Sequence, residues 1–243
     1  MKRYELDTKV HDIDNMLSME QIEDYLRCRK YWELKYIDKV PIDESDMCAK
    51  WVKYRRGMGA AWKAYGSGAD KDQCVAAARA ISDLAGSHFA RYAYLYDWTV
   101  VAQDIPFRLP FRKTTGLYGH IPVILQHNTY HGKVVLDYRM SAIADKRLVD
   151  MRGMIGIYAA WKWGINANGF AVSWFNGDTY MSFPTTEQVK DVWNWHVADI
   201  IKEMVSKRKR ILPNATPENC NTCPVFDQCF DSFIKSGFVG EKL

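Results

Sequence analysis

The sequence predicts an α/β protein in which a central mixed sheet is flanked by helices and preceded by a helical lobe. Apolar residues recur at helical spacing up to about residue 96, and strand-like segments begin directly afterwards. The strand-like segments, rich in β-branched and aromatic residues, cover 98–109, 116–126, 132–139 and 169–183. Helical patterns at 148–163 and after residue 185 alternate with these segments, which favours one mixed core.

The first predicted helix begins at Ser18, where Ser18-Met19-Glu20-Gln21 reads as a capping box. It is expected to end before Pro41. Two more helices are expected at 46–65 and 71–96, separated by a Gly-Ser-Gly sequence. These helices form the predicted N-terminal lobe.

The later segments carry their own turn and cap signals. Residues 126–132 are expected to form the loop of a hairpin between the second and third strands. Asn176-Gly177 predicts a type I′ turn within 169–183. Thr185 and Gln188 are expected to cap a long amphipathic helix that ends in a basic run.

The composition is that of a globular chain. The 243 residues are 48% hydrophobic and 26% charged, with a formal net charge of +4. No apolar run reaches the length of a membrane helix, and the N-terminus lacks a signal-peptide core, so we expect an intracellular, cytoplasmic protein with no membrane partner. No phosphate-binding Gly-x-x-x-x-Gly-Lys loop and no serine nucleophile elbow is present, which argues against an NTPase or an α/β-hydrolase.

Three cysteines gather near the C-terminus in the pattern Cys220-x2-Cys223-x5-Cys229. Three thiolates at this spacing indicate a metal site, and Cys28 on the first helix is a natural fourth ligand. A [4Fe–4S] cluster and a zinc ion both suit four cysteines, and spacing does not separate them. The alternative is a set of small buried hydrophobic side chains. Cys48 and Cys74 are expected to be structural.

One early cysteine followed by three late ones resembles the iron–sulfur RecB-like nucleases, a group that includes CRISPR-associated RecB-like exonucleases and AddB-type nuclease domains. The resemblance covers roughly residues 16–232, although Arg29 stands where the family commonly has proline after the first cysteine. It implies a single PD-(D/E)xK nuclease-like domain in which a four-cysteine iron–sulfur staple joins the N- and C-terminal regions. The implied parts are a helical lobe (18–96), a nuclease-like core (97–210) and a Cys-rich segment (211–243).

The family's hydrolytic residues are largely replaced in this sequence. Ala61 stands at the position of the metal-binding histidine, and Pro122 stands at that of the aspartate in Gly-x-x-Asp. Met154 replaces the glutamine of Gln-x-x-x-Tyr. None of the three offers a ligand to a hard cation such as Mg²⁺ or Mn²⁺.

Three motif positions remain: Asp137, Arg139 in place of lysine, and Tyr158. Asp137 and Arg139 should point to the same face of their strand, with Tyr158 on a neighbouring helix. We expect a catalytically degenerate pseudo-nuclease. The alternatives are a divergent exonuclease that uses Asp137 with Mg²⁺ or Mn²⁺, with His120 or Asp104 recruited to its site, and a structural subunit of a larger assembly.

DNA, as single strands or ends, is the expected partner, with a protein partner in a recombination or replication complex as a further expectation; phage–host conflict is another setting. Two basic clusters could meet phosphates. Lys53, Arg55 and Arg56 are interleaved with aromatic residues, which suits stacking on single strands. Lys207 and Arg208 lie in the basic run at the end of the last long helix. The alternative for Lys207 and Arg208 is a solvated helix C-terminus, and the favoured alternative for the other cluster is an amphipathic helix with Trp51 and Tyr54 directed inward.

Overall fold

The structure, a computed structural model, describes most of the chain in two compact units. The described residues are 15–42, 45–93, 95–112, 115–140, 146–205, 220 and 223–235. One unit comprises Met1–Met16 with Asp46–Ala198, and the other comprises Leu17–Ser45 with Asp199–Leu243. Each unit is therefore assembled from stretches that are distant in sequence, whereas the predicted division into lobe, core and Cys-rich segment followed the order of the chain.

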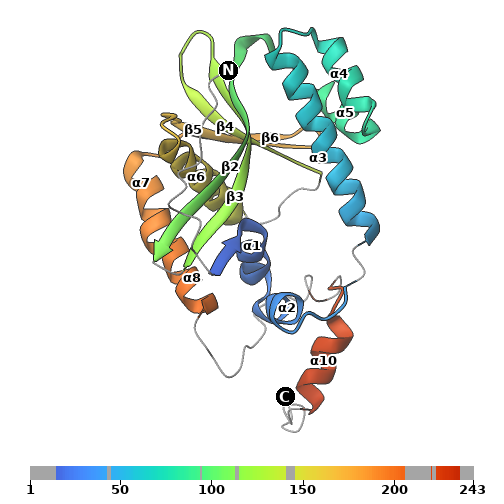
Figure 1. Ribbon diagram of the computed structural model, residues 1–243, viewed down its shortest axis with the longest axis vertical. Coiled ribbons are helices and arrows are strands. Elements are labelled where there is room, and N and C mark those ends of the chain that lie inside the picture. Colours follow the sequence, from blue (N-terminus) through green and yellow to red (C-terminus); the bar gives the residue numbers. More distant parts are fainter. Residues whose placement is uncertain are drawn as a thin grey trace. The chain divides into compact units, whose positions relative to one another are not determined.

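A mixed six-stranded sheet is the centre of the fold (Figure 1). Its order is β1-β3-β4-β5-β6, with β2 also paired to β3. The strands are β1 (Asn15–Ser18), β2 (Trp98–Arg112), β3 (Thr115–His127), β4 (Lys133–Arg139), β5 (Gly169–Trp174) and β6 (Thr179–Ser182). Among the pairs formed by β2 to β6, β4 and β5 run parallel to each other, and the other pairs are antiparallel. The predicted α/β class and mixed sheet are confirmed.

The β2–β3 ladder is interrupted opposite Pro122. Gln103 pairs with Val123 and Ile105 with Ile121, which leaves Asp104 facing the proline. Asp104 adopts a left-handed φ of 55°. A proline has no N–H to give to a ladder. The register is the same on both sides of this point, so the irregularity is confined to Asp104 and Pro122.

Helix α6 (Lys146–Lys162) packs on one face of the sheet. Gly153 allows this close approach, because a Cβ there would lie 2.2 Å from the ring of Phe170 on β5. Gly156 similarly faces Val135 on β4, at 3.0 Å from a built Cβ to Cγ1. Val135, Asp137 and Arg139 alternate on β4, so all three belong to the face that α6 covers.

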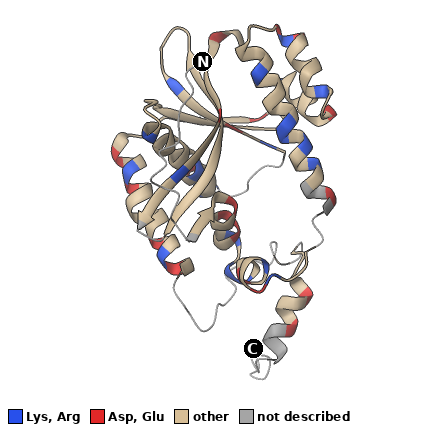
Figure 2. Ribbon diagram, in the orientation of Figure 1, with Lys and Arg blue, Asp and Glu red and all other residues tan. Residues whose placement is uncertain are grey.

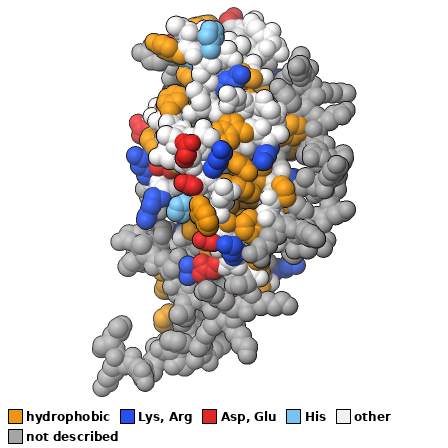
Figure 3. All heavy atoms as spheres, turned by 90° about the vertical axis from the view of Figure 1, so that its left-hand side faces the viewer, with side chains coloured by type: hydrophobic (Ala, Val, Ile, Leu, Met, Phe, Trp, Pro, Cys, Tyr) orange, Lys and Arg blue, Asp and Glu red, His pale blue; other side chains and the backbone are white. Residues whose placement is uncertain are grey.

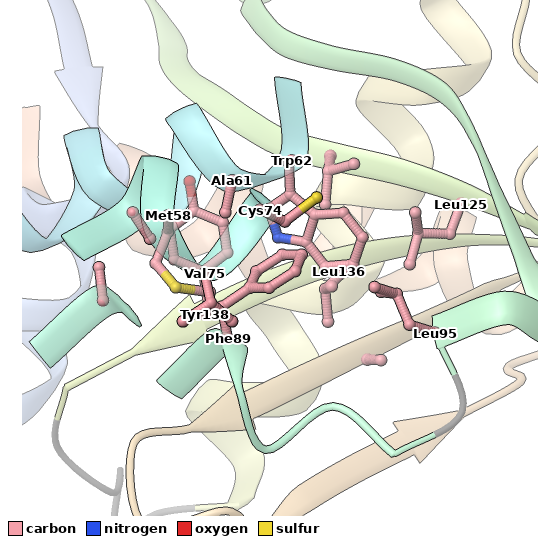
Figure 4. Close-up of a cluster of buried hydrophobic side chains, with 14 of the residues drawn as sticks. Met58, Ala61, Trp62, Cys74, Val75, Phe89, Leu95, Leu125, Leu136 and Tyr138 are labelled. Carbon is pink, nitrogen blue, oxygen red and sulfur yellow. The ribbon is translucent and has the colours of Figure 1, made fainter. Parts of the chain in front are cut away.

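The opposite face is covered by α3 (Ser45–Gly66), α4 (Lys71–Arg79) and α5 (Asp83–Phe89) (Figure 4). Trp62 of α3 lies at the centre of this core, with its ring 5.1 Å from that of Phe89 in an edge-on arrangement. Leu136 and Tyr138 contribute from β4. Ala61 and Cys74 are fully buried in the same cluster, which confirms a structural place for Cys74.

The predicted caps are confirmed. Ser18 Oγ accepts from the Gln21 backbone N–H at 3.1 Å, and the Gln21 side chain accepts from Ser18 N at 2.8 Å. Thr185 and Gln188 form the other predicted capping box. The helical stretch that follows Thr185 is α7 (Thr186–Asp191), a π-helical turn η4 (Val192–Val197) and α8 (Ala198–Val205), and α10 (Phe226–Lys235) comes later in the chain. None of the helices within the described ranges is long and apolar enough to cross a membrane.

Two predicted helices are interrupted, and one predicted turn is of another type. The first is divided into α1 (Met19–Arg27), α2 (Arg29–Trp32) and a π-helical turn η2 (Glu33–Ile37). The 71–96 helix ends at Arg79, because Ser82 caps a new helix through Ala85 N, and a short 3-10 turn η3 (Leu95–Asp97) follows. In the β5–β6 turn only Gly177 has a positive φ, whereas a type I′ turn needs one at Asn176 too.

Candidate functional site

Asp137 on β4 is held by two arginines. Its Oδ2 accepts from Arg139 Nε at 3.1 Å and from Arg152 Nε at 2.9 Å. Its Oδ1 accepts from the backbone N–H of Tyr138 at 3.0 Å. The predicted common face of Asp137 and Arg139 is confirmed. Arg152 comes from α6, and its contact follows from the packing of that helix against β4 and β5.

The two arginines keep Asp137 charged. The side chains of Asp137, Arg139 and Arg152 are each only 15% exposed. Burial by itself would raise the pKa of the Asp137 carboxyl, but the guanidinium groups of Arg152 and Arg139 outweigh it and lower the pKa to about 2. The carboxylate is therefore ionised at neutral pH, and both of its oxygens already accept hydrogen bonds.

A second polar group lies nearby and involves His120 on β3. Arg55 Nη2 lies 2.9 Å from His120 Nδ1, and His120 Nε2 bonds to Asp104 Oδ1. Because a guanidinium can only donate, Nδ1 must accept and Nε2–H must donate to Asp104. Burial and the Arg55 charge lower the pKa of His120, which favours this neutral tautomer.

Arg55 links the two groups electrostatically. Its charge contributes to lowering the pKa of Asp137, and the charge of Asp137 acts in the opposite direction on the pKa of His120, which it raises. The combined site, which we call the arginine site, consists of Arg55, Asp104, His120, Asp137, Arg139 and Arg152, contributed by α3, β2, β3, β4 and α6. With His120 neutral, three guanidinium charges face two carboxylates, so the site has an excess positive charge. Planar guanidinium groups in partly dehydrated surroundings are suited to binding phosphate oxygens.

The other motif positions contribute no ligands to this site. Ala61 is fully buried in the apolar core of α3 to α5, on the opposite side of the sheet from α6. Pro122 lies in β3, and Met154 lies on α6 with its side chain half-buried. Tyr158 is on α6 as expected, but it stacks on Trp193 at 5.1 Å between ring centroids. Arg152, rather than Tyr158, is the α6 residue that contacts Asp137.

The basic cluster on α3 divides between core, site and solvent. Tyr54 is fully buried, so it serves the core, whereas Lys53 and Arg56 are exposed. Arg55 stacks over the Trp51 ring, 4.6 Å from its centroid. Figure 2 shows basic positions repeated along α3. On the face shown in Figure 3, acidic and basic side chains are instead interspersed with hydrophobic ones. Lys207 and Arg208 lie outside the described residues.

The four predicted cysteine ligands belong to the second unit. Cys28, Cys223 and Cys229 share one apolar cluster with Tyr31, Leu34 and Val225. Cys220 lies one turn before Cys223, whose backbone N–H donates to the Cys220 carbonyl at 3.1 Å. Cys28 interrupts the helix with an extended backbone, and its Sγ accepts from Tyr31 N at 3.5 Å. The sulfur therefore caps α2 in the way that a serine oxygen normally would.

The thiols also influence one another. Burial, followed by the neighbouring Cys28, raises the pKa of Cys229 to about 11. Burial likewise raises the pKa of Cys223, although a hydrogen bond from the Val225 backbone opposes the effect. Within the described part of the chain, no three His, Cys, Asp or Glu side chains are close enough to hold one metal ion. The sulfurs of Cys28, Cys223 and Cys229 lie in an apolar shell, and backbone N–H groups are directed at Cys28 and Cys223, which is a donor set that would suit a thiolate-bound metal centre.

Arg152 is the site residue that the sequence analysis did not single out. A signal for Arg152 existed, since it is a charged residue on a helix whose other sheet-facing positions are glycine and aliphatic residues. Its partner could not be foreseen, because the contact depends on how α6 crosses β4.

Comparison with known proteins adds little. No protein-family model matches the chain, and no curated protein matches it. Among solved structures, one entitled "Crystal structure of SSO0001" is similar, with a TM-score of 0.45 and 10% identity, covering 89% of this chain and 86% of that chain. A likeness at this level identifies no function. The fold and its site therefore have to be interpreted from the geometry of this chain.

Proposed function

We propose that this chain is an iron–sulfur protein of RecB-like nuclease fold that binds DNA without hydrolysing it. The contacts of Asp137 carry the proposal. It is the only carboxylate that remains at the family's metal-binding positions, and its oxygens accept hydrogen bonds from two arginines and a backbone N–H. A divalent cation would have to displace these donors, and it would find only one carboxylate there.

The arginine site is the proposed point of contact with phosphate. In a nuclease, a metal ion bridges the protein and the phosphate. Here the guanidinium groups of Arg55, Arg139 and Arg152 would supply the positive charge instead. They bind an anion but cannot lower the pKa of a water molecule as a metal does, so binding is retained where hydrolysis is lost. Single-stranded DNA or DNA ends would be the ligand, in recombination, replication or phage–host conflict.

The four cysteines are the proposed ligands of a [4Fe–4S] cluster, with zinc as the alternative. Such a cluster, when bound, would crosslink the early helices to the C-terminal segment of the second unit and so stabilise that unit. The Tyr31 and Val225 backbone groups directed at Cys28 and Cys223 would donate to the ligand sulfurs. The apolar residues around them would keep water away from the cluster.

Cleavage and binding assays test the DNA proposal. We expect wild-type protein to show no cleavage of single- or double-stranded DNA above that of Asp137→Ala, with either Mg²⁺ or Mn²⁺ present. Binding to a fluorescent single strand should persist in EDTA and weaken with salt. Replacing exposed Lys53 and Arg56 with Gln should make the affinity less dependent on salt, with a slope lower by about one for each phosphate that is no longer neutralised. The exposed Lys190→Gln on α7 is the matched control.

Two results would contradict this proposal. Robust cleavage that Asp137→Ala abolishes would restore the exonuclease alternative, in which Asp104 and His120 join Asp137. Undetectable DNA binding at low salt would favour a structural subunit of an assembly.

Metal analysis tests the cysteine site separately. Protein purified without oxygen should be brown and contain about four iron and four sulfide ions per chain. Cys28→Ser should lose the metal and the stability of the second unit. Cys74→Ala is the matched control, because Cys74 is equally buried but lies in the core of the first unit; its metal content should not change. Stoichiometric zinc in colourless protein would replace the cluster by the zinc alternative, and full metal content in Cys28→Ser would exclude Cys28 as a ligand.

A further inference from the structure

A cavity of about 480 Å³ lies in the first unit, away from the residues of the arginine site. It is bounded by the C-terminal end of α3, the loop that leads into α4, and the segment that joins η3 to β2. The lining residues with aromatic or charged side chains are Tyr65, Tyr96, Trp98 and Asp70. The volume falls in the range usual for small-molecule sites.

Hydrogen bonds hold one wall of this cavity in place. Tyr65 Oη lies 2.6 Å from the Leu95 carbonyl and 2.7 Å from that of Trp98. Asn128, from the loop after β3, donates through Nδ2 to the Tyr96 carbonyl at 2.8 Å, and its N–H donates to Asp97 O. The wall that carries Tyr96 and Trp98 is therefore anchored from two directions and is formed in advance of any ligand.

The facing wall is also defined. The chain leaves α3 through Gly68 at a φ of 90°, where a built Cβ meets no atom within 4 Å. Ala69 N donates back to the Ala64 carbonyl at 3.1 Å, which closes the end of the helix. Asp70 follows as the N-cap of α4. Its Oδ1 accepts from Gln73 N at 2.8 Å.

The charge around the cavity is negative. The residues that line it include the Asp70 carboxylate and no basic side chain. The neighbouring Lys71 donates to the Tyr92 carbonyl instead. Among the described residues, no ion pair is formed by Asp70 or by the exposed Asp97, which is close enough to Tyr65 to influence its ionisation.

Aromatic rings beside carboxylates that form no ion pair are the surroundings that stabilise an organic cation. The ring faces attract positive charge, and a carboxylate accepts hydrogen bonds from ammonium or guanidinium N–H groups. We propose that this cavity binds an organic cation of the alkylammonium or guanidinium class. The proposal is independent of the DNA-binding proposal, since phosphate would be repelled by the same carboxylates.

The test uses 1,5-diaminopentane as the probe, with 1-pentanol and pentanoate as neutral and anionic controls of similar length. Binding is followed by calorimetry at low salt and by the NMR signal of the Trp98 indole N–H, assigned with Trp98→Phe. We expect a dissociation constant on the order of 1 mM or tighter for the diamine. The two controls should bind at least about tenfold more weakly.

Two variants link the effect to the cavity. Asp70→Asn keeps a good N-cap for α4 while removing the charge, so it should weaken diamine binding by about tenfold without unfolding the protein. Asp72→Asn, an exposed first-turn residue outside the cavity lining, is the matched control and should bind as wild type. Trp98→Leu should also weaken binding.

N-acetyl-lysine amide distinguishes a protein side chain from a free amine as the source of the cation. Tighter binding of the lysine derivative than of the diamine would indicate a partner protein, and the reverse order would indicate a free amine. The proposal is overturned if no cation binds, if pentanol or pentanoate binds as well as the diamine, or if Asp70→Asn leaves the affinity unchanged.

Discussion

The pair of Asp137 and Arg152 allows a quantitative test of the arginine site. Arg152→Met removes the guanidinium but keeps an unbranched side chain of similar reach on α6. The Asp137 carboxylate, 15% exposed, then keeps Arg139 and the Tyr138 N–H as its hydrogen-bond partners among the described residues. We expect this variant to lose about 2 kcal/mol of unfolding free energy at pH 7, because a buried charge is left partly uncompensated.

The magnitude follows from the pKa of Asp137. A carboxyl whose pKa is about 2 rather than near 4 has its charged form stabilised in the folded state by about 2.5 kcal/mol. The charge of Arg152 is the largest single favourable cause of this lowered pKa, so removing it should abolish a substantial part of the effect. In a double-mutant cycle with Asp137→Asn, the coupling energy should be about 1.5 kcal/mol.

The stabilisation by Asp137 should depend on pH in a defined direction. The folded-state pKa is lowered, so the stabilisation is complete above the unfolded pKa near 4 and is lost as the pH falls toward about 2. Urea unfolding followed by circular dichroism at pH 7 and pH 3 measures both effects. The difference between wild type and Arg152→Met should shrink at pH 3. A coupling energy below about 0.3 kcal/mol, within the usual additivity of independent sites, would refute the inferred ion pair.

Two further predictions concern the core. His88 is buried between Tyr54 Oη at 2.5 Å and Ser173 Oγ at 2.8 Å, and burial lowers its pKa to about 4. The free energy of unfolding should therefore fall by about 3 kcal/mol as the pH decreases from about 6.5 to 4. This loss should be absent in His88→Gln, and an equal loss in that variant would contradict the prediction. Gly153→Ala should cost about 2 kcal/mol in urea unfolding, because its Cβ would lie 2.2 Å from the Phe170 ring; Gly59→Ala, which meets no atom within 4 Å, is the control and should not destabilise.

Much of the fold could be predicted because its signals are local. The strand segments and both capping boxes depend on alternation or on residues three apart, and the structure places each within a few residues of its expected position. The helix break at Cys28 was missed for a physical reason. A cysteine in an apolar helical pattern is normally a buried helix residue, whereas here its sulfur caps the next helix.

The candidate site was less predictable than the fold. Motif spacing located Asp137 and Arg139, which are close in sequence and share a strand face. It could not locate Arg152 or Arg55, since their positions depend on how α6 and α3 pack on the sheet. The prediction of a type I′ turn was wrong, because the loop includes Phe175 and Asp178 as well as the Asn-Gly pair.

The replaced motif residues and the arginines are connected by charge balance. A buried carboxylate at the position of Asp137 needs a positive partner, which in a metal-dependent nuclease is the cation itself. With Ala61, Pro122 and Met154 at the other ligand positions, a cation would be held by too few oxygens to compensate that carboxylate. Arg139 and Arg152 provide the compensation through the covalent chain, independently of any bound metal. Under the proposed function, the same two contacts that stabilise the fold occupy the oxygens that hydrolysis would require, so loss of cleavage and retention of an anion-binding surface would be consequences of one arrangement.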